Sequence, residues 1–189
     1  MKRSSFVATG LMILLAGAAS AAEVDLASEP VAVTRTQVVS HAGQKFDFPD
    51  DFAGKRVVIG FQFTGCVQIC PVSNAVLAAV DAQLQEREFD DVRLISLTLD
   101  PLGDSPEKLA AHAQELAASR KWLWLTGDID AIDRLNGELG VVRGADQNHE
   151  AFLLLGDPKG MRFTRIFIAP KVPSADDILG ALRRLDTAR

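Results

Sequence analysis

Hydrophobic and polar positions along the 189-residue chain follow two periods, which predict a series of strands and helices. Short runs rich in β-branched and aromatic residues have the composition and length of buried strands. Longer stretches with an apolar residue every three or four positions have the spacing of helices that bury one face. The expected strands are 56–63, 92–99, 121–126, 151–155 and 162–168, and the expected helices are 72–86, 105–119, 128–139 and 174–185.

Turn-forming residues divide these elements and indicate the fold class. Two short β-like runs within 37–48 flank a turn at 41–44, which predicts an N-terminal β-hairpin. Ser105 followed by Pro106 is typical of a helix start, because a serine side chain caps the first amides and the first turn of a helix tolerates proline. Strands that alternate with helices and end on a hairpin and a helix predict an α/β sheet with helices on both faces. Residues 23–36 lack periodicity, so we expect a loose lead-in to one domain over 37–189.

Composition and charge exclude several classes of protein. The chain is 48% hydrophobic and 24% charged, which is typical of a folded core. Its net charge is −5 and it has no basic run, so the counterion-displacing surface of a nucleic-acid-binding protein is missing. No apolar run reaches the roughly 18 residues of a transmembrane helix, and we expect no stable membrane insertion.

The first 22 residues have the pattern of a cleavable signal peptide. Lys2 and Arg3 form a basic start, 6–18 form a short apolar segment, and small residues favour cleavage after Ala21 or Ala22. Cleavage would remove two basic residues and no acidic one, which makes the net charge −7. The sequence therefore predicts a periplasmic protein. The alternative is an uncleaved N-terminal segment that anchors the protein to the membrane, facing the periplasm.

Cys66 and Cys70 are the only thiols, and they lie between a predicted strand and a predicted helix. On a helical turn, positions four apart share a face with Cβ atoms roughly 5–6 Å apart. Two thiolates at that separation can hold one soft ion or close into a disulfide. A helix N-terminus favours the thiolate form. A purely structural disulfide is the less favoured alternative, because so short a loop removes little entropy from the unfolded chain. Redox chemistry, metal binding or both stay open.

A metal site would need a third ligand, and the chain has three histidines. His41 falls at the predicted hairpin turn and His112 on a predicted exposed helix, so we expect both to be solvated. His149 directly precedes the strand expected at 151–155 and can reach the same end of the sheet as the cysteines. Two sulfurs and one imidazole suit Cu(I), and with an added ligand Cu(II), while zinc also accepts these ligand types.

The chain resembles the SCO/SenC family of copper-binding proteins from about residue 37 to residue 185. A Cys-x-x-x-Cys-Pro motif with a distant histidine is specific as a set. Two positions depart from the common pattern: Val67 stands where proline is usual, and Gly65 where histidine is frequent. The segments that carry the resemblance are Gly54-Lys55, 61–71, Leu99-Asp100-Pro101, Asp104-Ser105-Pro106, 124–127 and 149–152.

This resemblance implies a fold, a cofactor and a partner. The fold would be thioredoxin-like, with one copper ion per chain, as Cu(I), Cu(II) or both, on Cys66, Cys70 and His149. A monomeric chaperone of this kind would deliver copper to the dinuclear copper centre of a haem–copper oxidase, with other periplasmic copper carriers as further partners. Such delivery needs no catalytic turnover. The competing function is a thiol-disulfide oxidoreductase that reduces the cysteines of the oxidase copper site through Cys66 and Cys70.

Four other residues have alternative interpretations. Asp100 and Asp104 match acidic positions of the family. For Asp104 we favour helix capping beside Ser105. Asp100 is either a neighbour of the metal ligands or a turn residue at a strand end. Trp122 and Trp124 alternate with leucines in a short strand, which predicts core contacts on both faces of the sheet.

Overall fold

A computed structural model describes residues 29–86, 89–141, 151–157 and 162–187. It confirms the predicted order of strands and helices, and each element lies close to its expected position. The strands are β1 (Glu29–Pro30), β2 (Thr36–Ser40), β3 (Lys45–Phe48), β4 (Arg56–Gln62), β5 (Val92–Thr98), β6 (Trp122–Thr126), β7 (Phe152–Asp157) and β8 (Arg162–Phe167). The helices are η1 (Asp50–Phe52), α1 (Cys70–Glu86), α2 (Pro106–Glu115), α3 (Ile129–Glu138) and α4 (Ala175–Thr187).

The strands form one mixed sheet in the order β1-β8-β7-β4-β5-β6-β2-β3. The pairs β4–β5 and β5–β6 are parallel, so these three strands end at the same edge of the sheet. Strand β7 is antiparallel to both β4 and β8, which brings the end of β8 to that edge as well. We call this the carboxyl edge, and its strands end at Gln62, Thr98, Thr126 and Phe167.

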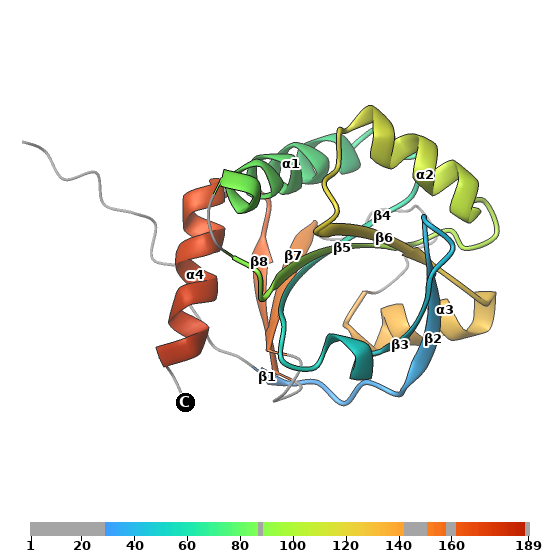
Figure 1. The fold of residues 1–189 in the computed structure, drawn as a ribbon, viewed down its shortest axis with the longest axis horizontal. Coiled ribbons are helices and arrows are strands. Elements are labelled where there is room, and N and C mark those ends of the chain that lie inside the picture. The colour runs from blue at the N-terminus through green and yellow to red at the C-terminus, as the bar shows by residue number, and fades with distance from the viewer. Residues whose placement is uncertain (1–28, 87–88, 142–150, 158–161, 188–189) are drawn as a thin grey trace, which may run out of the picture.

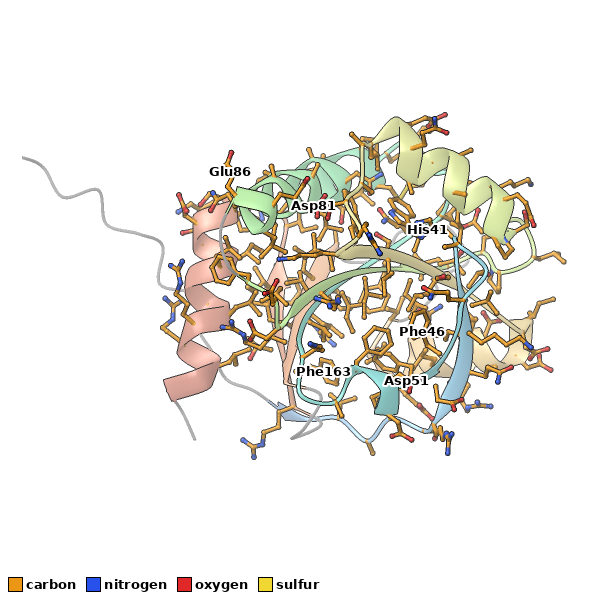
Figure 2. All side chains as sticks on the ribbon, in the orientation of Figure 1. His41, Phe46, Asp51, Asp81, Glu86 and Phe163 are labelled. Atoms are coloured by element: carbon orange, nitrogen blue, oxygen red, sulfur yellow. A yellow bond between two sulfur atoms is a disulfide. The ribbon has the colours of Figure 1, made fainter. Side chains whose placement is uncertain are left out.

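Helices cover both faces of the sheet, as expected for this α/β class. Figure 1 shows the sheet as an arch, with α1, α2 and α4 outside it and α3 beside β2. Alternate residues of a strand therefore contribute to different cores. Val58 packs in the core beneath α1 and α4, whereas its neighbours Val57 and Ile59 pack in the core enclosed by the arch. Figure 2 shows Phe46 and Phe163 directed into that enclosed core.

The tryptophan strand contributes to both cores, as predicted. Trp122 and Trp124 are buried beneath the outer helices and stack on each other, with ring centroids 5.4 Å apart. Leu125 points to the opposite face and is buried in the enclosed core. The indole Nε1 of Trp122 donates a hydrogen bond to Ser96 Oγ at 2.8 Å, which satisfies its polar atom within the core.

Two local features differ clearly from the sequence-based expectation. Helix α2 ends at Glu115 rather than near Ser119, because Ala117 adopts a left-handed conformation (φ 51°) that stops the helix. Glycine usually occupies such a position, so alanine left no signal in the sequence. Within the segment expected to be a loose lead-in, β1 pairs with β8 over two residues. Two paired residues are too few to produce a detectable alternation of apolar and polar positions.

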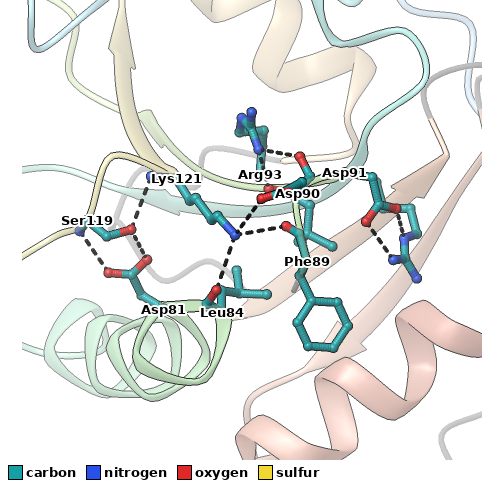
Figure 3. Close-up of polar contacts among 10 residues, drawn as sticks. Asp81, Leu84, Phe89, Asp90, Asp91, Arg93, Ser119 and Lys121 are labelled. Carbon is teal, nitrogen blue, oxygen red and sulfur yellow. Dashed lines mark hydrogen bonds and ion pairs between the residues drawn. The ribbon is translucent and has the colours of Figure 1, made fainter. Parts of the chain in front are cut away.

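A buried carboxylate joins α1 to the turn before β6, at the end of the sheet away from the carboxyl edge (Figure 3). Asp81 is only 2% exposed, and it accepts hydrogen bonds from the Ser119 amide at 2.8 Å and the Ser119 hydroxyl at 2.5 Å. Beside it, Lys121 Nζ donates to the carbonyl oxygens of Leu84 and Phe89. These contacts hold the end of α1 against the start of the central strands.

We predict that Asp81→Ala lowers the free energy of unfolding by about 2–3 kcal/mol, because two donors of Ser119 lose a buried charged acceptor. Urea denaturation followed by circular dichroism measures the effect. Asp81→Asn keeps one acceptor oxygen and should cost less. An unchanged unfolding midpoint for Asp81→Ala would show that this contact contributes little to stability.

Candidate functional site

A disulfide joins Cys66 to Cys70 in the loop between β4 and α1. The Cα atoms lie 5.8 Å apart, within the range that a disulfide requires. The two cysteines differ in exposure, because Cys66 is partly exposed whereas Cys70 is 2% exposed. The pair thus has one sulfur that an external reactant can approach and one that the protein shields.

The loop positions both cysteines through backbone contacts. The Cys66 amide donates to the Phe63 carbonyl oxygen at 3.1 Å, which closes a turn immediately after β4. Helix α1 begins at Cys70, two residues earlier than the apolar spacing predicts, and Pro71 lies in its first turn. The Cys70 amide approaches Cys66 Sγ at 3.4 Å. When the disulfide is reduced, the helix N-terminus therefore favours the thiolate form of these sulfurs.

Asp104 holds the cysteine loop, a role that the sequence analysis did not assign to it. Its carboxylate is 1% exposed and accepts hydrogen bonds from the Thr64 hydroxyl at 2.6 Å and the Thr98 hydroxyl at 2.6 Å. The Thr64 amide also donates to it at 3.2 Å. Thr64 lies two residues before Cys66, so Asp104 fixes that loop to the end of β5.

The expectation that Asp104 caps a helix is therefore wrong. Ser105 alone caps α2, since its hydroxyl oxygen accepts from the Lys108 amide at 3.4 Å. One sign in the sequence indicated another role for Asp104, its match to an acidic position of the family. The adjacent Ser105 favoured the helix-cap interpretation instead. Asp100 is a turn residue: it is exposed, and its Oδ1 accepts from the Gly103 amide at 3.1 Å.

We predict that Asp104→Ala makes the Cys66–Cys70 disulfide easier to reduce by about tenfold. The freed loop holds the two sulfurs together less often, which lowers their effective concentration. Equilibration with reduced and oxidised glutathione measures the change. Ser105→Ala is the matched control, because it removes only the α2 cap, at a cost of about 1 kcal/mol. An unchanged thiol–disulfide equilibrium in Asp104→Ala would contradict the role of this carboxylate.

His41 lies in the turn after β2, as expected, but it is partly buried rather than fully solvated. Its Nδ1 accepts a hydrogen bond from the Trp124 amide at 3.2 Å, and its own amide donates to the Trp124 carbonyl oxygen at 2.8 Å. Figure 2 shows it at the end of β2, below α2. Burial lowers the pKa of the imidazole. His41 thus joins β2 to β6.

His112 is also packed rather than solvated. Its ring meets Trp124 edge-on, with centroids 5.1 Å apart. Its Nε2 lies 3.3 Å from the Asn74 side-chain amide, and its Nδ1 lies 3.2 Å from Glu115 Oε2. These contacts connect α2 to α1 and β6. The third histidine, His149, lies outside the residues that the structure describes.

A small cleft opens beside the cysteine loop at the carboxyl edge. Ile69, just before α1, and Ser73, in its first turn, contribute to it from either side of Cys70. Val141 and Ala151 also line it, and they are the described residues that precede and follow 142–150. The remaining lining residues are apolar: Phe61, Phe152 and Ile168.

A family model described as SCO1/SenC matches residues 27–185. The chain belongs to the SCO1/SenC family. The chain spans about half the length of the curated relatives that it matches. One of these is Protein sco1 of Schizosaccharomyces pombe, which is 28% identical over 141 residues, covering 69% of this chain and 52% of the relative.

Solved structures of this family share the fold. BsSco, described as a member of the Sco family of cytochrome c oxidase assembly proteins with a disulfide switch, matches with a TM-score of 0.72 and 23% identity. That match covers 86% of this chain and 97% of BsSco. Yeast Sco1 with copper bound matches with a TM-score of 0.65 and 21% identity, covering 85% and 94% of the two chains. The thioredoxin-like α/β fold is thereby confirmed.

Within the residues that the structure describes, no helix combines the length and hydropathy needed to cross a membrane.

Proposed function

We propose that this SCO1/SenC protein is a periplasmic copper chaperone that carries one copper ion on Cys66, Cys70 and His149. The observation that carries the proposal is the placement of two cysteines, close enough to be bonded, at the N-terminus of α1. After reduction, both thiolates face the same small volume. Thiolates are soft ligands and favour Cu(I) over harder divalent ions.

The surroundings of the cleft support His149 as the third ligand. Ala151 lines the same cleft as Ile69 and Ser73, which lie on either side of Cys70. His149 precedes Ala151 by two residues, and two residues span at most about 7 Å. An imidazole nitrogen would complete a three-coordinate site for Cu(I). A further ligand would adapt the same site to Cu(II).

The oxidation state of the cysteine pair would control copper loading. In the disulfide form neither sulfur is a thiolate, so the protein must be reduced by two electrons before it binds copper. Export through the leader at 1–22 would place the protein in the periplasm, where thiols tend to oxidise. Retention of that leader as a membrane anchor is the alternative. The proposed recipient is the copper-bearing subunit of a haem–copper oxidase, with other periplasmic copper carriers as further partners.

A transfer experiment tests this function. Copper-loaded protein is mixed with the purified, copper-free and reduced copper-bearing domain of the oxidase subunit from the same organism. With two equivalents of the Cu(I)-loaded protein under anaerobic conditions, we expect copper to move to the domain, and the absorption bands of the dinuclear centre to appear once a one-electron oxidant is added. Copper that stays on the chaperone, with no such bands, would contradict delivery.

The unequal exposure of the two sulfurs favours a second candidate, the thiol-disulfide oxidoreductase. In the reduced protein the Cys66 thiolate would attack a disulfide in the partner and form a mixed disulfide. The Cys70 thiolate would then attack Cys66 Sγ and release the partner as a dithiol, leaving the Cys66–Cys70 disulfide. Reduction of the oxidised oxidase domain by copper-free protein, equally fast in His149→Ala, would support this activity instead.

A further inference from the structure

Among the residues that the structure describes, the large apolar side chains with the greatest exposure lie at one edge of the sheet. In the described part of the chain, five large apolar side chains are strongly exposed. Each ends or follows a strand at the carboxyl edge, after β4, β5, β6 or β8. The five, called here the apolar ring, are Val67 (86% exposed), Leu102 (82%), Val172 (52%), Phe167 (47%) and Ile129 (44%).

Contacts connect segments that carry the ring to the cysteine loop or to the end of β5. Thr64, before Cys66, is bonded to Asp104, which follows the loop that carries Leu102. The second half of helix α3 is tied to the end of β5, since Nδ2 of Asn136, two turns after Ile129, donates to the Thr98 carbonyl oxygen at 3.0 Å. On the other side, the segment after β8 meets the cysteine loop at the cleft.

Single exposed apolar residues scattered over a surface need no explanation, but a group confined to one edge does. Val67 and Leu102 are almost fully exposed to water, and Val67 lies between the two cysteines. These positions have no packing role that would account for an apolar side chain. A binding surface does account for them, because association would remove the apolar area from water.

Charged residues beside the ring indicate what kind of partner would fit. The exposed charged side chains next to Leu102 and Ile129 are mainly acidic, with Lys108 as a cation among them, whereas the exposed Lys171 lies beside Val172. The acidic border beside Leu102 and Ile129 favours a partner with lysine or arginine around its own binding patch. The acidic residues are Asp100, Glu107, Asp128 and Asp130.

We infer that the apolar ring docks a protein domain that presents its own cysteine pair within an apolar patch bordered by basic residues. Docking of this kind brings the partner's thiols to Cys66, the more exposed of the two cysteines. The inference rests on the proposed function, because both copper transfer and disulfide exchange need this approach. It adds the surface that selects the partner and the residues that form it.

Isothermal titration of the protein with the purified oxidase copper-bearing domain tests this surface. The triple variant Val67→Ser, Leu102→Ser and Ile129→Ser should weaken binding by about tenfold or more. A higher salt concentration should also weaken the binding of the wild-type protein, because salt screens the attraction between the two charged surfaces. Ala53→Ser is the matched control, because Ala53 is exposed before β4, at the opposite edge of the sheet. Circular dichroism shows whether each variant is folded, and these exposed positions should tolerate serine.

A parallel copper titration distinguishes a failure of the apolar ring from a failure of the proposed copper-chaperone function. Weakened docking with unchanged copper stoichiometry supports the apolar ring. Equal affinity of the triple variant and the wild type overturns the ring, while normal copper binding leaves the proposed function intact. A wild-type protein that binds neither copper nor the domain would contradict both.

Discussion

The double variant Cys66→Ser, Cys70→Ser is expected to lose tight copper binding altogether. A serine hydroxyl stays protonated at neutral pH and is a hard oxygen ligand, so it cannot replace a thiolate on Cu(I). The two sulfurs are the only thiols of the chain, and no other cysteine can substitute. Copper content after exposure to excess Cu(I) under anaerobic conditions, followed by desalting, measures the loss.

The fold should survive this substitution. The disulfide closes a loop of only a few residues, so its loss costs about 2 kcal/mol at most in the chain-entropy model. Val67→Ala is the matched control, because it lies between the cysteines and is 86% exposed but offers no ligand atom. Full copper loading of the double serine variant would place the metal elsewhere. Loss of copper in Val67→Ala would mean that loop conformation, rather than the thiolates, controls binding.

His149→Ala should weaken copper binding by about a hundredfold or more, because the remaining two sulfurs leave the ion without its imidazole ligand. Competition with a chromophoric Cu(I) chelator measures the affinity. Disulfide exchange with glutathione should change little, because that reaction uses only Cys66 and Cys70. This difference separates a metal ligand from a residue that supports the loop.

The other two histidines provide the controls for this prediction. His41 is bonded through Nδ1 to the Trp124 amide, and His112 packs against Trp124 and Asn74. His41→Gln and His112→Gln should therefore keep their copper affinity, even if they lose some stability. Weakened copper binding in His112→Gln, with none in His149→Ala, would show that the third ligand has been assigned to the wrong residue.

The order of the elements could be predicted because each leaves a periodic signal in the sequence. The core strand β4 is buried along its whole length and carries the run RVVIGFQ, and α2 begins with Ser105 and Pro106. Features without such a signal were missed. The end of α2 depends on one alanine with positive φ, and the β1 pairing involves two residues.

The site could be predicted only in part, because side-chain partners depend on the three-dimensional arrangement. The cysteine pair is local, so its spacing indicated a disulfide or a metal site. Asp104 contacts Thr64 across 40 positions, and the helix start beside it gave a stronger local signal. His41 and His112 are packed because Trp124 lies next to both, which no local pattern shows. The leader at 1–22 and the role of His149 stay predictions.

X-ray absorption at the copper K-edge of the loaded, reduced protein tests the ligand set most directly. Our account predicts one copper per chain with two sulfur neighbours at a thiolate distance and one imidazole nitrogen, and the nitrogen should disappear in His149→Ala. A copper ion without sulfur neighbours, or an identical spectrum in His149→Ala, would contradict the proposed site.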